Sequence, residues 1–149
     1  MSTEDTKAVI RQYFDQFLNQ ADPAAAERLL APDFVCHVPG ANDLDREGYT
    51  HSIRSGRAAM PDLSYTPQEI IAEGDRVAVR YTMSGTQTGS WQGVPPSGKK
   101  VNVLAICTYR VAGGQIREKW LLADSLGLLR QIGALPQSQA ATAAQATPA

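Results

Sequence analysis

Residues 113–133 read GGQIREKWLLADSLGLLRQIG. The Gly-Gly pair is typical of a hairpin turn. The residues after it have the pattern of a strand, and the apolar segment at the end has the pattern of a short helix. Successive side chains of a regular strand point to opposite faces, so one face would carry Glu118, Trp120, Leu122 and Asp124. Asp124 would then lie in apolar surroundings at the end of the strand. Burial there would make its carboxylate a stronger base than a solvated aspartate.

A second interpretation of Asp124 is purely structural. An Asp between a strand and a helix commonly caps the helix, because its side-chain oxygen accepts a hydrogen bond from one of the first free backbone amides. Ser125, the next residue, could cap the helix in the same way. The local pattern leaves two roles open, a helix cap and a general base that transfers protons to and from carbon.

The composition is that of an ordinary globular protein. Of 149 residues, 43% are hydrophobic and 19% are charged, enough for one domain with a core or a pocket. The net charge of −1 provides no basic surface for a phosphate backbone, so we expect no nucleic-acid partner. Residues 1–5 lack the features of a signal peptide and no long apolar run follows, so we expect a cytoplasmic protein without membrane contact. Cys36 and Cys107 stand without metal-ligand spacing, and we expect no metal site.

Helical patterns come first along the chain and strand patterns follow. Apolar residues at helical spacing predict two helices before residue 31 and a third over 46–59. A short strand at 34–38 comes between them. Glycine-rich turns then separate longer strands over 63–73, 75–88, 99–112 and 115–123. This order predicts an α+β domain over residues 1–135, with helices on one face of an antiparallel sheet.

Several short strings, in this order along the chain, resemble one protein family. They are Ala31-Pro32-Asp33-Phe34 with His37 and Pro39-Gly40, Met60-Pro61-Asp62-Leu63, EGDRVAVR at 73–80, GVPPSGK at 93–99, and Trp120 with Asp124. Over residues 5–133 the chain is similar to the SnoaL-like polyketide or ester cyclases of the nuclear transport factor 2-like (cystatin-like) superfamily. No single string is diagnostic, but their order and spacing are specific.

The resemblance implies a fold and a chemistry. The fold is a curved antiparallel sheet that forms a cone-shaped cavity with the N-terminal helices, and two copies form a homodimer through the sheet. In family cyclases the acid that matches Asp124 removes a proton from a carbon flanked by carbonyls, and the enolate closes a ring by aldol attack on a second carbonyl. The reaction uses neither cofactor nor metal. The implied ligand is a small apolar or polyketide-like molecule.

His37 is the second candidate catalytic residue. On its strand it opposes Cys36, and the resemblance implies that it reaches the cavity. It would there donate a hydrogen bond to an enolate oxygen or act as a partner to Asp124. A single histidine on a strand is equally compatible with a structural role. We take His51, in a polar helix, as a surface residue.

The candidates for substrate binding are Trp120, Arg80, Tyr65 and Trp91. The aromatic rings would line the pocket, although aromatic side chains at such spacings are by default part of the core. Arg80 would meet a carboxylate or carbonyl group, or it forms an ion pair at the surface. Asp62 favours a turn or cap over a second catalytic acid. If the catalytic hypothesis holds, Asp124, His37 and Trp120 should converge on one closed pocket.

Two departures from the family pattern keep other functions open. Gln87 stands where many members have His, and the strand over 101–111 offers Ala105, Cys107 and Tyr109 on one face, where antibiotic cyclases are more polar. The main hypothesis is a cofactor-free cyclase, and whether the chain is catalytically active stays open. The alternatives are another acid–base enzyme of the same fold, such as an isomerase or epoxide hydrolase, and a non-catalytic small-molecule binding or dimerisation module.

Residues 136–149 contain only Ala, Gln, Thr, Ser and Pro. Such a segment cannot bury enough surface to offset its loss of conformational entropy, so we predict a disordered tail. Deletion of residues 137–149 should leave the melting temperature and any activity unchanged within error, as calorimetry and an activity assay can measure. A loss of several degrees on truncation would show that the tail docks on the domain.

Overall fold

The computed structural model describes residues 1–136, so the predicted tail lies outside the described residues except for Pro136. The helical segments are α1 (Thr3–Gln12), its π-helical continuation η1 (Tyr13–Asn19), α2 (Pro23–Leu29), α3 (Arg46–Ala59) and α4 (Ser125–Gln131). The N-caps of the α-helices all accept a hydrogen bond from a first-turn backbone amide, and they are Ser2, Asp22, Asp45 and Asp124. These helices therefore begin where the sequence supplies a capping oxygen.

The strands form one sheet in the order β2-β1-β6-β5-β4-β3. They are β1 (Leu30–His37), β2 (Leu44–Asp45), β3 (Ser64–Glu73), β4 (Arg76–Thr86), β5 (Lys100–Ala112) and β6 (Gln115–Trp120). The expected antiparallel run of four long strands is confirmed in β3 to β6. The sheet as a whole is mixed, because β1 pairs with β6 in parallel. The sequence did not predict this pairing, since the two strands lie far apart in the chain and leave no local pattern.

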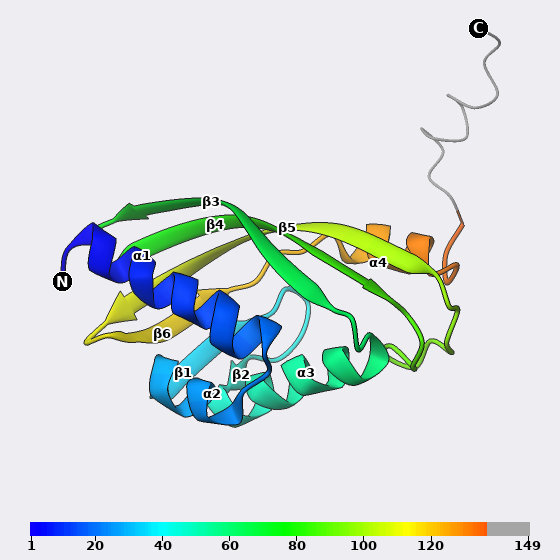
Figure 1. Ribbon diagram of the computed structural model, residues 1–149, viewed down its shortest axis with the longest axis horizontal. Helices are drawn as coiled ribbons and strands as arrows, with labels where there is room; N and C mark the ends of the chain where they lie inside the picture. Colours follow the sequence, from blue (N-terminus) through cyan, green and yellow to red (C-terminus); the bar gives the residue numbers. More distant parts are fainter. Residues whose placement is uncertain (137–149) are drawn as a thin grey trace, which may run out of the picture.

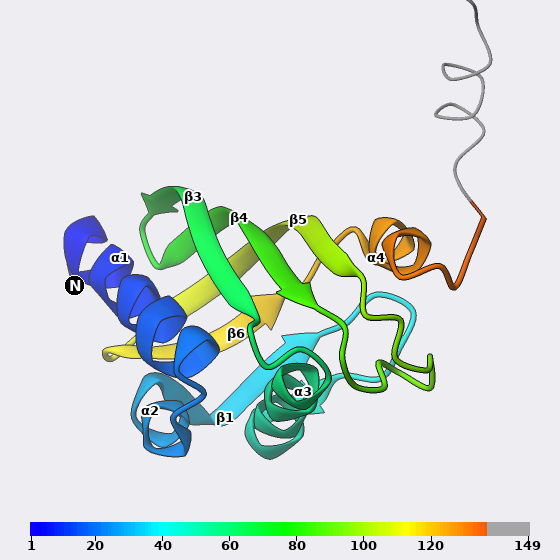
Figure 2. The same ribbon diagram turned by 45° about the vertical axis from the view of Figure 1, so that its right-hand side comes forward.

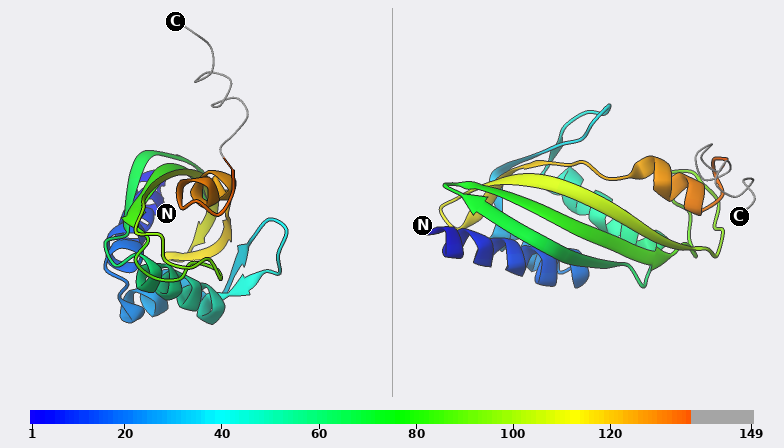
Figure 3. Two further views of the ribbon diagram at one scale, coloured as in Figure 1. Left: turned by 90° about the vertical axis from the view of Figure 1, so that its right-hand side faces the viewer. Right: turned by 90° about the horizontal axis from the view of Figure 1, so that it is seen from above.

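The sheet is curved, and helices cover its concave side (Figures 1 and 2). In both views α1 with η1, α2 and α3 lie along the same side of the sheet. Seen end-on, strands β3 to β6 arch over these helices (Figure 3). The last helix, α4, packs at the start of β5, where the Gln131 side chain hydrogen-bonds with the backbone of Asn102. The α+β architecture expected from the sequence is therefore confirmed.

Strand β5 shows how the two faces of the sheet differ. Its odd-numbered residues from Val101 to Val111 are buried, and its even-numbered residues from Lys100 to Thr108 are exposed. The buried face packs on an aromatic group contributed by helices and strands, which comprises Tyr13, Phe14, Phe17, Phe34, Tyr49, Tyr65, Tyr81 and Tyr109. The core thus lies between the concave face of the sheet and the helices.

A β-bulge in β6 shifts the direction of its side chains. Arg110 of β5 pairs with Glu118 and Val111 pairs with Ile116, so β6 has one extra residue, Arg117. Ile116 and Lys119 are consequently both buried, although they are three positions apart. The bulge therefore turns a lysine into the core.

Gln87 organises the loop that follows β4. Its side chain is fully buried, its amide donates to the backbone carbonyls of Val94 and Pro95, and its oxygen accepts hydrogen bonds from Ser97. These bonds fold residues 88–99 back on themselves. The residue that departs from the family pattern is thus a structural one here.

Candidate functional site

A cavity of about 250 Å³ lies on the concave side of the sheet, beside α3. Most of its wall is apolar, with side chains such as Val38, Leu44, Ile53, Met83, Val103 and Leu128. The rings of Tyr49, Tyr65, Tyr81 and Trp91 add aromatic surface. An apolar pocket with a few polar groups is the usual form of a site for a small molecule.

Lys119 of β6 is the charged side chain of this cavity wall. The residue is only 2% exposed. Its Nζ donates hydrogen bonds to the hydroxyl of Tyr49 at 2.8 Å and to that of Tyr13 at 3.1 Å, and the two hydroxyls also bind each other. Aromatic rings surround the ammonium group, with the ring centre of Tyr49 at 5.1 Å and that of Tyr109 at 5.4 Å.

The buried groups of this cluster have shifted pKa values. Burial acts to lower the pKa of Lys119, and attraction to Tyr81, Cys107 and Cys36, once these groups are ionised at high pH, raises it. Burial raises the pKa of Tyr13 well above its usual range. At neutral pH the Nζ of Lys119 thus donates its hydrogen bonds to uncharged phenol oxygens.

Asp124 lies at the N-cap of α4 with an exposed side chain. Its Oδ1 accepts a hydrogen bond of 2.9 Å from the amide of Gly127, so the capping interpretation is confirmed. Its neighbours Ala123 and Ser125 line the cavity, whereas the Asp124 side chain does not.

The expectation that Asp124 lies in apolar surroundings is wrong. Alternation continues beyond the end of β6 at Trp120, because Ala123 still pairs with Ala105 of β5. Leu121 and Ala123 therefore line the cavity, whereas Leu122, which is 62% exposed, and Asp124 face outward. The face that Glu118 and Trp120 share is the outer face of the sheet, because the bulge at Arg117 turns Lys119 inward.

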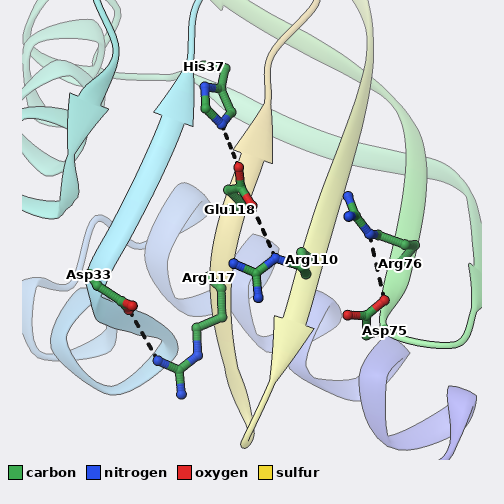
Figure 4. Close-up of polar contacts among 7 residues, drawn as sticks. All are labelled: Asp33, His37, Asp75, Arg76, Arg110, Arg117 and Glu118. Atoms are coloured by element: carbon green, nitrogen blue, oxygen red, sulfur yellow. Dashed lines mark hydrogen bonds and ion pairs between the residues drawn. The ribbon is translucent and has the colours of Figure 1, made fainter.

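His37 lies beside Trp120 on that outer face. Their rings stack with centres 5.2 Å apart. The Nε2 of His37 is 2.7 Å from a carboxylate oxygen of Glu118, and the other oxygen of Glu118 accepts a hydrogen bond from Arg110 (Figure 4). The Nδ1 of His37 is 3.1 Å from the carboxylate of Asp43. Both ring nitrogens of His37 are thus occupied outside the cavity, and Asp124, His37 and Trp120 do not converge on one pocket.

The candidates for substrate binding divide between the two faces. Tyr65 and Trp91 line the cavity as expected. Arg80 is exposed, opposite Ile106 on the neighbouring strand, and does not line it. Asp62 accepts two hydrogen bonds from Thr86, which confirms its structural interpretation.

Lys119 is the residue that sequence reasoning missed. It belongs to the run Arg117-Glu118-Lys119 in a strand with neighbours on both sides. Three consecutive charged residues in such a strand place at least one charge on the inner face, because side chains alternate. That signal was present in the sequence, but the bulge decides which residue turns inward.

Residues 1–136 contain neither a metal-binding group of side chains nor a membrane-spanning helix. Within residues 1–136, no three His, Cys, Asp or Glu side chains gather as a metal-binding group would require. The helices of this range are also too short or too polar for any of them to span a membrane.

Known proteins resemble this chain in sequence and in structure. The family model described as SnoaL-like polyketide cyclase matches residues 8–132. The structure of TsrD from Streptomyces laurentii is 30% identical, with a TM-score of 0.81, over 91% of this chain and 99% of that chain. IdmH from Streptomyces antibioticus, described as "a putative polyketide cyclase", is 31% identical, with a TM-score of 0.77, over 86% of this chain and 98% of that chain.

A third similar structure carries a different description. AclR from Streptomyces galilaeus, described as "a putative hydroxylase", is 28% identical, with a TM-score of 0.84, over 97% of this chain and 92% of that chain. No curated protein sequence matches this chain significantly. Structures of one fold thus carry descriptions of more than one chemistry.

The His37–Glu118 pair predicts a pH dependence of stability. The hydrogen bond to Glu118 raises the pKa of His37 above its usual 6.5, and the same bond lowers the pKa of Glu118 below its usual 4.5. The stabilisation from His37 is lost as the pH rises through its raised pKa, and that from Glu118 is lost as the pH falls through its lowered pKa. The pair should therefore stabilise the fold most between pH 4.5 and 6.5.

Glu118→Gln should lower the pKa of His37, which a proton NMR titration can follow with exposed His51 as internal reference. Asp43→Asn should lower it less, because the Glu118 hydrogen bond is the larger cause of the shift. In chemical denaturation, Glu118→Gln should lose most stability relative to wild type between pH 4.5 and 6.5. Unchanged titration of His37 in Glu118→Gln would contradict this assignment.

Proposed function

Because this chain belongs to the SnoaL-like polyketide cyclase family, we propose that it binds a small apolar carbonyl compound in the cavity beside α3 and closes a ring in it by proton transfer. The observation that carries the proposal is the cavity itself. It combines apolar and aromatic walls with a buried amine and a phenol, Lys119 and Tyr49. Such a site holds an apolar ligand in a folded conformation and excludes water from its reacting carbons.

The proposed step is an intramolecular aldol closure. A base takes the proton from a carbon between two carbonyls, and the electrons of that C–H bond form an enolate. The enolate carbon then bonds to a second carbonyl carbon of the same molecule, whose oxygen takes the proton back. Atoms and charge balance without an oxidant, metal or organic cofactor.

We propose Asp124 as the group that takes and returns the proton. Two observations support it: the match to the family acid, and the position of Asp124 between Ala123 and Ser125, which both line the cavity. Its carboxylate must leave the cap of α4 to reach the ligand. Loss of a capping bond costs about 1 kcal/mol, which is small beside an enzymatic barrier.

A second candidate function is a small-molecule binding module without catalysis. The exposed, capping Asp124 favours it, since no acid of the described residues lines the cavity. An epoxide hydrolase has less support. It would need two acids and an arginine around one water. Asp62 instead binds Thr86, and Arg80 is exposed.

We also propose that the protein is a homodimer formed through the outer face of the sheet. Three large apolar side chains are exposed there: Leu104 at 46%, Ile106 at 51% and Leu122 at 62%. Ile106 and Leu122 belong to neighbouring segments, because the amide of Ile106 donates to the carbonyl of Leu122. Exposed apolar patches of this kind are typical of interfaces between subunits.

Sedimentation at micromolar concentration should show a dimer for the wild-type protein. Ile106→Lys should shift it to a monomer, because a charge in the centre of an apolar interface is not compensated. Ser55→Lys, at an exposed position of α3, should remain a dimer. A wild-type monomer would refute the dimer.

The catalytic proposal is tested by Asp124→Asn. Asn caps a helix about as well as Asp but cannot accept the proton, so the variant should fold and bind ligand while its rate falls at least about a hundredfold. Polyketide methyl esters, β-keto esters and small epoxides would serve as substrates, with and without a chelator. Asp22→Asn, which changes the cap of α2 instead, should keep full activity.

The outcomes separate the candidate functions. Activity that survives Asp124→Asn would leave that residue as a cap only. Activity lost with the chelator would refute the cofactor-free chemistry. Binding of these compounds without turnover would favour the binding module.

A further inference from the structure

Lys119 carries a buried positive charge without a negative partner in the described part of the chain. Within residues 1–136 no ion pair involves Lys119. The adjacent carboxylate, Glu118, binds His37 and Arg110 on the opposite face of the strand. The hydrogen-bond acceptors of Lys119 are two phenol oxygens.

A buried charge without an opposite partner lowers the stability of the fold. Desolvation of a buried ion costs several kcal/mol, and a buried charge is usually paired with an opposite one. Hydroxyls and aromatic faces offset only part of that cost. A methionine of similar length would fill the same space without the cost.

The cluster of Lys119, Tyr13 and Tyr49 has hydrogen-bond donors that its internal bonds do not use. An ammonium group has three N–H donors, and the hydroxyls of Tyr49 and Tyr13 take two of them. The two hydroxyls have two protons, of which their mutual hydrogen bond uses one. When Tyr13 donates in that bond, the proton of Tyr49 is free, and both Tyr49 and Lys119 line the cavity.

Two donors, the third N–H of Lys119 and the hydroxyl of Tyr49, thus remain on residues that line an otherwise apolar cavity. We infer that Lys119, together with Tyr49, is the anion-binding group of the cavity, and that the natural ligand is a compact apolar molecule that carries an anionic oxygen. A carboxylate or the enolate of a 1,3-dicarbonyl has this chemistry. The inference rests on the proposed function, since it names the class of ligand for the same cavity.

The charge requirement can be tested with two probes of nearly equal shape. Naphthalene-2-carboxylate and naphthalene-2-carboxamide share the apolar body, and only the first is an anion. In calorimetric titrations at pH 7 the wild-type protein should bind the carboxylate at least about tenfold more tightly, as expected for a charge-assisted hydrogen bond in a buried site. This comparison requires no variant.

Lys119→Met should abolish the preference for the carboxylate and leave carboxamide affinity within about threefold. Lys100→Met, which removes an exposed lysine, should keep the wild-type preference. Without ligand, Lys119→Met should melt no lower than the wild type, because an unpaired buried charge is removed. A large drop in its melting temperature would mean that the ammonium group is a structural part of the tyrosine cluster, and would overturn the inference.

The remaining outcomes separate this inference from the proposed function. Equal affinity of the wild-type protein for both probes would overturn the anion assignment and leave the cavity as a ligand site. Failure of both probes to bind at millimolar concentration would overturn the ligand-binding function and the anion assignment together.

Discussion

The buried ammonium group of Lys119 specifies how the two layers of this domain meet, at a cost in stability rather than a gain. Its hydrogen bonds reach Tyr13 in η1 and Tyr49 in α3, and the rings of Tyr81 and Tyr109 approach it from β4 and β5. A charge is tolerated at this depth only while all of these partners are in place. The helices and the sheet therefore hold one specific relative position, which apolar packing alone would specify less strictly.

One extra residue in β6 divides the chemistry of the domain between its two faces. The bulge at Arg117 sends Lys119 inward and leaves Glu118 and Trp120 outside. The inner face becomes an apolar cavity with one cation, and the outer face a network in which Glu118 joins His37 to Arg110. Bulges often re-aim side chains next to functional sites, and this one determines which charge meets the ligand.

Much of the fold follows from local signals in the sequence. Apolar residues at helical spacing placed the helices, and glycine-rich turns placed β3 to β6. The site was harder to predict from the sequence. Its geometry depends on which side chains point inward after the bulge in β6 and on the parallel pairing of β1 with β6. Local alternation correctly set His37 opposite Cys36, but only the assembled sheet shows that the histidine side is the outer one. Tyr65 and Trp91 line the cavity as expected from their aromatic side chains, but the same reasoning placed Trp120 there, and Trp120 lies on the outer face.

The parallel pairing of β1 with β6 also governs when the domain can assemble. His37 and Glu118, which meet across this pair, are 81 positions apart in the chain. During synthesis from the N-terminus, β1 has no sheet neighbour except the two-residue β2 until β6 has emerged. Phe34 and Cys36 then lack the strand beside them, and closing so long a loop is slow because of its entropy. Until residue 120 has been synthesised, the chain therefore exposes apolar surface that the finished sheet covers, and such surface favours aggregation.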